Sequence, residues 1–434
     1  MNSDLPSSPM EQAQVAWEFP RPSIDLCTCI TARVYYPSQN EVMMVDNILV
    51  PTEQVSNNTI TADPGENSSS SSRNDNSGEN TIMEDNVPIV TEKQSFPKAY
   101  CLQRMLLQEE VTTFARVYHG IVLEKAPIGK NYDWIVTNEG CTVKKLSWDY
   151  IQDWQNRGIA ENPLTDIAAM QYLKQFFKHR HWQDTHLLTP MDIWSDTSYL
   201  YMVLPFCHGD NTILSEIQIQ NKISEEDSRN IFHQLLVGVS HLQQAGVCHR
   251  NFSLENCRLL HRSSTTVAVI IDFGVCLKIP YQRNPTPVNT PAAASSNTSQ
   301  DDNVVSARDV VDYRNEKRCW IVPSGSVGNL GCRSPEIVAN STPFDGYAVD
   351  IWACGVILFI MTTGFPPWEI ASPITDENFL YMSSEYTVQC ITDWNLDLSQ
   401  DLKDLFLRMF WLDPKERFCL QQILQHPWMT NHQQ

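Results

Sequence analysis

Positive charge is scarce in this sequence. Its 434 residues include 31 Lys and Arg against 51 Asp and Glu, a formal net charge of −20. A surface this acidic repels phosphate backbones and anionic lipid, so we expect no nucleic-acid partner and no membrane partner. The charge is uneven, because residues 1–95 hold 14 acidic and 4 basic side chains, half of the net charge.

Metal-ligand spacing, a secretory signal and a long apolar run are lacking too. The 13 cysteines form no Cys-x-x-Cys pair, which favours free thiols in a reducing, intracellular compartment, cytoplasmic or nuclear. No apolar segment follows a basic one at the start, so we expect no signal peptide. The longest apolar run, residues 351–361, is about half of the ~20 residues that span a bilayer, which predicts a buried helix.

Two stretches are too polar to fold by themselves. We expect residues 1–95 to be a disordered acidic region, since residues 67–80 contain no large apolar side chain to offset ~1–2 kcal/mol of backbone entropy per residue. Within it, residues 26–50 are less polar and could pair as strands or dock on a partner. The second stretch, about 280–322, is rich in Pro, Ser and Thr, as in a solvated loop. Its Thr-Pro pairs at Thr286 and Thr290 fit proline-directed phosphorylation sites, and the stretch as a whole could be an inhibitory flap or an inert linker.

Between these stretches the hydrophobic pattern changes along the chain. Residues 114–124, 133–145 and 200–204 read as strands, whereas residues 164–177 and 224–244 have apolar side chains at helical spacing. Strands come first and helices later. This order predicts an α+β domain with a small sheet-rich half and a larger helical half.

Six short motifs follow one another along the second half of the chain. They are C-H-R-N-F-S-L-E-N at 248–256, D-F-G at 272–274, S-P-E at 334–336, D-I-W-A-C-G-V-I-L at 350–358, D-P-K-E-R at 413–417 and H-P-W at 426–428. In this order they resemble the motifs of the Ser/Thr protein kinases, in the C-terminal half those of the calcium/calmodulin-dependent group, and together they make chance agreement very improbable. The resemblance implies a bilobal fold with an N-lobe at 100–206 and a C-lobe at 207–430, in which the 280–322 insertion lies in the activation segment.

The resemblance also implies a site for ATP and Mg²⁺. Asp272 would hold one metal ion and Asn256 a second, and Lys144 would pair with the α- and β-phosphates, with Lys145 as a neighbouring alternative. Leu204 falls at the gatekeeper position, and Pro205 begins the hinge.

Three further motif residues are expected to be structural. Glu336 and Arg417 resemble the buried ion pair that anchors the activation segment, and Asp350 resembles the helix residue that braces the catalytic loop.

Catalytic positions have been replaced. Asn251 stands where the catalytic Asp is expected, and an amide cannot accept the proton of a substrate hydroxyl, a contribution of ~10²–10⁴ in rate. Ser253 stands where a Lys usually faces the γ-phosphate, so a positive charge is missing there.

Nucleotide-binding positions are altered as well. In the alignment that places Val117 at the conserved Val, the three glycine positions of the phosphate loop become Glu110, Thr112 and Ala115, whose side chains would hold the backbone away from phosphate. Asp166 replaces the helix Glu that pairs with the strand Lys, and its side chain is one methylene shorter. At the adenine site, Thr142 replaces an Ala and Arg258 replaces an apolar residue.

Three functions remain open on this basis. The first is a pseudokinase that binds Mg-nucleotide weakly and acts as an allosteric partner or scaffold for another protein. The second is a working Ser/Thr kinase of reduced rate with a protein substrate, because phosphoryl transfer depends mainly on positioning and metal. The third is a binding module that does not take nucleotide.

Overall fold

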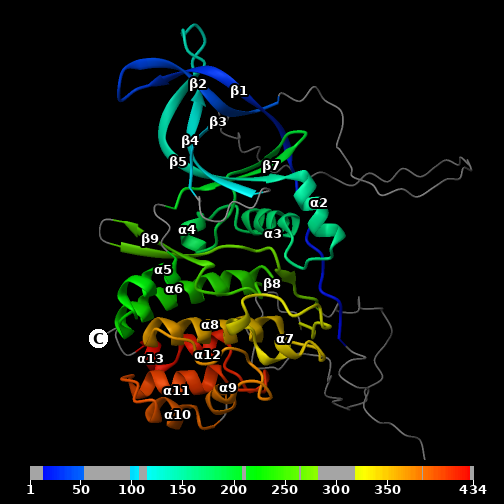
Figure 1. Ribbon diagram of the computed structural model, residues 1–434, viewed down its shortest axis with the longest axis vertical. Coiled ribbons are helices and arrows are strands. Elements are labelled where there is room, and N and C mark those ends of the chain that lie inside the picture. The colour runs from blue at the N-terminus through cyan, green and yellow to red at the C-terminus, as the bar shows by residue number, and fades with distance from the viewer. Residues whose placement is uncertain are drawn as a thin grey trace, which may run out of the picture.

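A computed structural model describes residues 13–52, 98–106, 115–207, 212–262, 265–281, 318–383 and 385–430. Figure 1 shows strands gathered at one end of the molecule and helices at the other, as expected for a bilobal protein-kinase-like fold. The sheet-rich lobe comprises β1 (Asp25–Tyr36), β2 (Glu41–Pro51), β3 (Lys98–Met105), β4 (Ala115–Lys125), β5 (Trp134–Ser147), α2 (Trp148–Asn156), α3 (Pro163–Phe176), α4 (Trp182–Thr185), β6 (Asp192–Ser195) and β7 (Tyr199–Pro205).

The strands of the sheet-rich lobe close on themselves. Their order is β1-β2-β3-β4-β5-β7-β6, and β1 completes the ring by pairing in parallel with β6, where Asp25 lies opposite Trp194. The expectation of one disordered region over residues 1–95 is therefore wrong for 25–51. Alternating apolar residues in these strands, such as Ala32 and Val34, point into the lobe and are buried, which is why the segment pairs.

The alternation of side chains along β5 sorts its residues between two faces. Cys141 and Val143 are fully buried in the core of the sheet, whereas Thr142 and Lys144 are only half-buried and point the other way. The sheet thus presents Thr142 and Lys144 toward the helical lobe.

The helical lobe is built around α6 and α8. Ser224 caps α6 through a bond from Asp227 N to its Oγ at 3.1 Å, which confirms the expected helix start. α8 is apolar on all sides and buried, which confirms the helix expected over 351–361. The lobe comprises α5 (Ile213–Gln220), α6 (Glu225–Gln244), β8 (Val247–Cys248), β9 (Cys257–Arg262), β10 (Thr265–Ile270), β11 (Leu277–Lys278), a 3₁₀ turn (Leu330–Cys332), α7 (Pro335–Ala339), α8 (Gly346–Thr363), α9 (Glu377–Met382), α10 (Thr387–Asp393), α11 (Gln400–Met409), α12 (Leu420–Leu424) and α13 (Pro427–Thr430).

Within the described ranges, α8 is the single helix long and apolar enough to cross a membrane. Its 18-residue window is 89% buried inside the lobe, with the rings of Trp368 and Phe410 at 5.2 and 5.4 Å from that of Trp352. These contacts make α8 the centre of the core, in agreement with its sequence pattern.

The two ends of the 280–322 insertion are packed. Tyr281 pairs with Arg318 in a β-bridge, and Cys319 N donates to Pro280 O at 2.8 Å. Arg318 makes a bidentate ion pair with Asp345, with its Nη2 2.7 Å from Oδ2, and both side chains are 4% exposed. The expected solvated stretch is therefore too wide, since 280–281 and 318–322 belong to the folded lobe. Residues 282–317, which include Thr286 and Thr290, lie outside the described residues.

Candidate active site

The loop that carries Asn251 is held from below by α8. Asp350 accepts hydrogen bonds from the backbone N–H groups of His249 at 2.7 Å and Arg250 at 2.8 Å. Burial raises the pKa of the Asp350 carboxyl to about 7, although the two N–H donors oppose this shift. The expected bracing role of Asp350 is thus confirmed.

His249 links this loop to the strand that leads into Asp272. Its ring lies 4.5 Å from that of Phe252 and 5.2 Å from that of Phe273, and its Nε2 is 3.1 Å from the carbonyl oxygen of Ile271. Burial lowers the pKa of His249 to about 4, so the imidazole is neutral near pH 7. A neutral, buried ring at this place packs the loop against Phe252 and Phe273.

Asn251 lies at the centre of the site and both ends of its amide are occupied. Its Nδ2 donates to Oδ2 of Asp272 at 2.9 Å, and its Oδ1 accepts from the backbone N–H of Asn329 at 3.1 Å. The amide therefore joins the D-F-G motif to the activation segment.

Asp272 and Asn256 are brought together around Asn251, as expected. Asn256 donates from Nδ2 to the carbonyl oxygen of Asn251 at 3.0 Å, while Asp272, at φ 65°, accepts from Gly274 N at 3.3 Å. A carboxylate and an amide oxygen are hard donors that suit Mg²⁺, which keeps water and phosphate as its other ligands. Over the described part of the chain, no group of three or more His, Cys, Asp or Glu is placed to hold a metal alone. The donor set thus fits a magnesium ion that arrives with a nucleotide.

The two adjacent lysines of β5 face opposite sides. Lys145 Nζ lies 3.7 Å from the ring centroid of Tyr199 and 5.5 Å from that of Tyr201, on the face of β5 that also carries Cys141 and Val143. Burial raises the pKa of both Asp166 and Glu161, and the positive charge of Lys144, in contrast to that of Lys145, opposes this shift in each. Of the two candidates, Lys144 is therefore the one that faces the cleft.

Asp166 comes near Lys144 but is engaged elsewhere. Its Oδ1 accepts from the backbone N–H of Phe273 at 3.0 Å, and no ion pair between Lys144 and Asp166 is found among the described residues. Burial raises the pKa of Asp166 to about 6, with the positive charge of Lys144 opposing the shift. The short carboxylate ties α3 to the D-F-G motif in place of the pairing that the family pattern implies.

Changing Asp166 to Asn should stabilise the protein at pH 7.5 and leave it unchanged near pH 4. A carboxyl whose folded pKa is about 6 loses stability as the pH rises from its unfolded value of ~3.9 to 6. An Asn keeps an oxygen for Phe273 N without the charge, so we expect a gain of about 1–3 kcal/mol in unfolding free energy at pH 7.5. Urea denaturation at both pH values measures it. Asp149→Asn, an exposed acid in α2, should show no such difference, and an equal response of the two variants would refute the assignment.

One functional residue, Glu161, belongs to no sequence motif. It precedes Asn162, the N-cap of α3, and its Cγ lies 3.2 Å from where a Cβ on Gly274 would be. Burial and the charge of Asp272 raise the pKa of Glu161. The sequence gives little indication of this residue, because only the path of the loop before α3 places the Glu161 carboxylate beside Gly274.

A cavity of about 410 Å³ opens beside these groups. Ser253, 2% exposed, is in its wall, so the position expected to face the γ-phosphate carries only a hydroxyl. The Glu161 carboxylate lines the same cavity, where the Lys expected at position 253 would have supplied the opposite charge. The walls of the cavity include Glu161, Asn251, Ser253, Glu255, Asn256, Val275, Gly328, Asn329 and Arg333.

The expected adenine side lies where β5 meets the hinge. Thr142 is opposite Leu204 in the sheet, and Val117 on β4 is opposite Lys144. Leu204 packs on the apolar cluster of Leu188, Leu260 and Val269. Pro205 ends β7 opposite Cys141, and the ring of the next residue, Phe206, lies 4.5 Å from that of His119.

Arg258 lies close to the hinge. It is on β9, opposite Val269, and its charge lowers the pKa of Cys207 against the upward effect of burial. Of the phosphate-loop positions, Glu110 and Thr112 lie outside the described residues, and Ala115 begins β4.

Comparison with known proteins supports the same assignment. The family model described as the protein kinase domain matches residues 136–429. The chain is 24% identical over 279 residues to Serine/threonine-protein kinase SAPK6 of Oryza sativa subsp. japonica, covering 62% of this chain and 65% of that protein. It is 25% identical over 243 residues to Calcium/calmodulin-dependent protein kinase type II subunit delta of Oryctolagus cuniculus, covering 55% of this chain and 37% of that protein. The alignment thus spans less than two thirds of each relative.

Proposed function

Because the chain belongs to the protein kinase family, we propose that it is a pseudokinase, with a retained Mg-ATP site and weak or absent phosphoryl transfer. The observation that carries the proposal is the hydrogen bond from Asn251 Nδ2 to Asp272 Oδ2 at 2.9 Å. The residue at the catalytic position donates to the metal-binding carboxylate, whereas catalysis needs a group that accepts a proton there.

The surroundings of Asn251 support this proposal. Its Oδ1 is already an acceptor for Asn329 N, so the amide has little freedom to orient a substrate hydroxyl. Ser253 supplies no charge to a transferring phosphate, and the Asp166 carboxylate is bonded to Phe273 N. Each change removes or occupies a group that would otherwise stabilise the transition state.

A Ser/Thr kinase of reduced rate is the second candidate. Lys144, Asn256 and Asp272 are all present. Asn251 is hydrogen-bonded to both Asp272 and Asn256, and the charge of Lys144 acts on Asp166, which holds Phe273 N beside Asp272. Since phosphoryl transfer depends largely on positioning and metal charge, these groups could support slow turnover with ATP and a protein substrate.

We propose that the protein acts through a protein partner in signalling inside the cell. Its 13 cysteines are all free thiols, most of them buried, which is typical of a reducing compartment. In this proposal the kinase fold serves as an allosteric partner or scaffold.

Saturating Mg-ATP should raise the melting temperature of the full chain by a few degrees. A ligand at about 100 times its dissociation constant stabilises by ~2.7 kcal/mol. The shift should need magnesium, because the Asp272 carboxylate and the phosphates are both negatively charged and a metal ion is needed to bridge them. Lys144→Ala should abolish it, while Lys145→Ala, which removes the charge from the opposite face of β5, should keep it.

The outcomes separate the candidates. A magnesium-dependent shift without phosphate transfer to any protein supports the pseudokinase, and turnover supports the slow kinase. No shift at millimolar nucleotide would contradict both and leave the binding module that takes no nucleotide.

A further inference from the structure

Residues 13–24, here called the N-terminal strap, run from the helical lobe up to β1 and touch both lobes (Figure 1). At the lower end, Gln14 N donates to Trp320 O at 2.9 Å, and Val322 N donates to Gln14 O at 3.0 Å. Trp17 N donates to Lys278 O at 3.0 Å. The strap therefore pairs with both ends of the activation segment that flank residues 282–317.

Aromatic side chains fix the middle of the strap. The ring of Trp17 lies 5.9 Å from that of Tyr281, and Trp17 packs on the buried cluster that contains Ile321. Two residues later, the ring of Phe19 lies 5.7 Å from that of Tyr172 on α3. Two neighbouring aromatic side chains thus reach two different elements.

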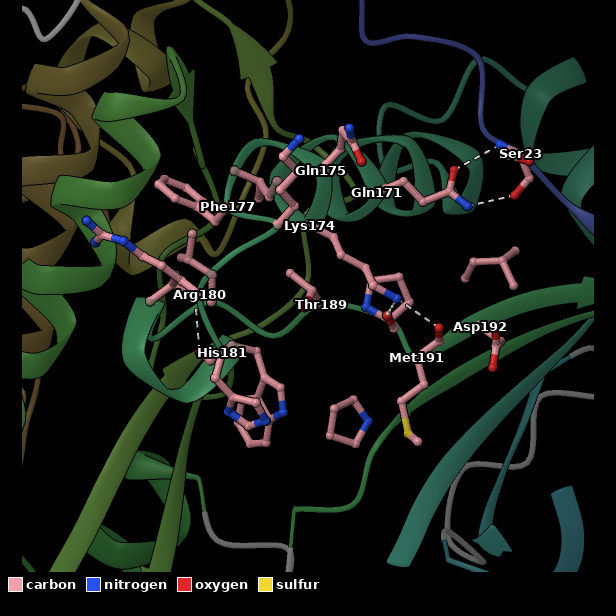
Figure 2. A pocket seen from close by; sticks show the side chains of 18 of the residues that line it. Ser23, Gln171, Lys174, Gln175, Phe177, Arg180, His181, Thr189, Met191 and Asp192 are labelled. Carbon is pink, nitrogen blue, oxygen red and sulfur yellow. Dashed lines mark hydrogen bonds between the residues drawn. The ribbon is translucent and has the colours of Figure 1, made fainter. Parts of the chain in front are cut away.

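The upper end of the strap is bonded to α3 as well. Ser23 N donates to Gln171 Oε1 at 2.9 Å, and Gln171 Nε2 donates to Ser23 O at 2.6 Å. Figure 2 shows the Gln171 amide turned toward the main chain of Ser23, beside a cavity of about 530 Å³ between α3 and β6. The strap then enters β1, which pairs with β6.

The elements joined by the strap also meet each other. Lys278 Nζ lies 4.7 Å from the ring centroid of Tyr172, and Tyr172 OH donates to Ala245 O at 2.8 Å. The opposite side of α3 carries Asp166, which holds Phe273 N beside Asp272. A shift of α3 away from the strap would therefore move a group that borders the metal site.

We propose that the N-terminal strap is a detachable clamp that sets the position of α3 against the activation segment and so sets the nucleotide affinity of the cleft. Its contacts are to elements of the same chain, and all of them come from 12 consecutive residues at one end of the folded part. A segment held by a few local contacts can open by itself while the rest of the fold stays closed. The nucleotide part of this inference rests on the proposed function, whereas the clamp itself does not.

The test is amide hydrogen exchange on the full chain, without nucleotide, in the double variant Trp17→Ala with Phe19→Ala. We expect exchange to accelerate by at least about tenfold in both α3 and residues 318–322, since two aromatic contacts are lost from one segment. Glu18→Ala, an exposed residue between the two, is the control and should change neither. Acceleration confined to residues 13–24 would overturn the proposal.

A second variant keeps the test decisive if the double variant unfolds. Gln171→Ala removes both bonds to Ser23 and replaces Gln by a better helix former, so α3 itself is not weakened. Faster exchange in α3 supports the clamp, and unchanged exchange contradicts it. Titration of each variant with Mg-ATP then measures its nucleotide affinity. If the wild-type chain binds no nucleotide, the proposed function is contradicted, whereas the hydrogen-exchange result still tests the clamp.

Discussion

Replacing Arg318 by Met should lower the free energy of unfolding by about 3–5 kcal/mol, because it leaves the Asp345 carboxylate buried without its partner. The guanidinium donates to both carboxylate oxygens, at 3.2 and 2.7 Å, and stacks 4.8 Å from the ring of Tyr347. Asp345 also caps α8 by accepting from Tyr347 N at 3.0 Å, so the loss reaches the central helix. Urea denaturation followed by circular dichroism gives the difference.

The same substitution at an exposed ion pair is the control. Arg157 pairs with Asp153 one turn away on α2, with side chains 63% and 58% exposed, so Arg157→Met should cost less than about 0.5 kcal/mol. The double variant Arg318→Met with Asp345→Asn removes the stranded charge but keeps an oxygen for the helix cap. It should recover part of the loss, and a double variant no better than Arg318→Met would show that burial of the Asp345 charge is not the cause.

Changing Asn251 to Asp should make the stability of the protein depend on magnesium and should raise any phosphate transfer sharply. In the present arrangement the amide donates to Asp272 at 2.9 Å, and a carboxylate there would replace a hydrogen bond by a repulsion between like charges. Without metal we expect a loss of ~1.5–3 kcal/mol, the usual value of a hydrogen bond to a charged group. Millimolar Mg²⁺ should restore it by neutralising the pair. Restoring the base should increase transfer by ~10²–10⁴ if the rest of the site is sound.

Asn251→Ala is the matched control, since it removes the bond without adding charge. It should be destabilised alike with and without magnesium, and its phosphate transfer should not rise. If Asn251→Asp behaves like the Ala variant in both respects, also when Mg²⁺ is added together with ATP, the cleft does not hold a metal ion at Asp272, and the pseudokinase with a retained Mg-ATP site is contradicted.

The retained parts of the fold could be predicted from sequence because their residues occur in short motifs. The blocks around Asn251, Asp272 and Asp350 bring fixed loop geometry with them, and the structure joins all three by hydrogen bonds. The hydrophobic pattern also located α6, α8 and β7, because each of these elements buries a strongly apolar set of side chains.

Contacts that depend on the path of the chain could not be predicted. Glu161 reaches Asp272 only because the loop before α3 bends over Gly274, and no local pattern encodes that bend. The shorter side chain of Asp166 made a pair with Lys144 depend on the position of α3, and its bond to Phe273 N could not be predicted from the sequence. Residues 26–50 could be predicted only as strands or as a docking segment, because a long polar stretch separates β1 and β2 from β3.

The closed sheet determines which N-terminal boundary a folded fragment of this protein can have. β1 and β2 cover one side of β3 and one side of β6, where Ile48 lies opposite Cys101 and Asp25 opposite Trp194. A fragment begun at residue 96, where the composition changes, would leave β3 and β6 as open sheet edges with free N–H and C=O groups. Such edges template pairing between molecules, so this fragment would aggregate for a reason unrelated to its cleft.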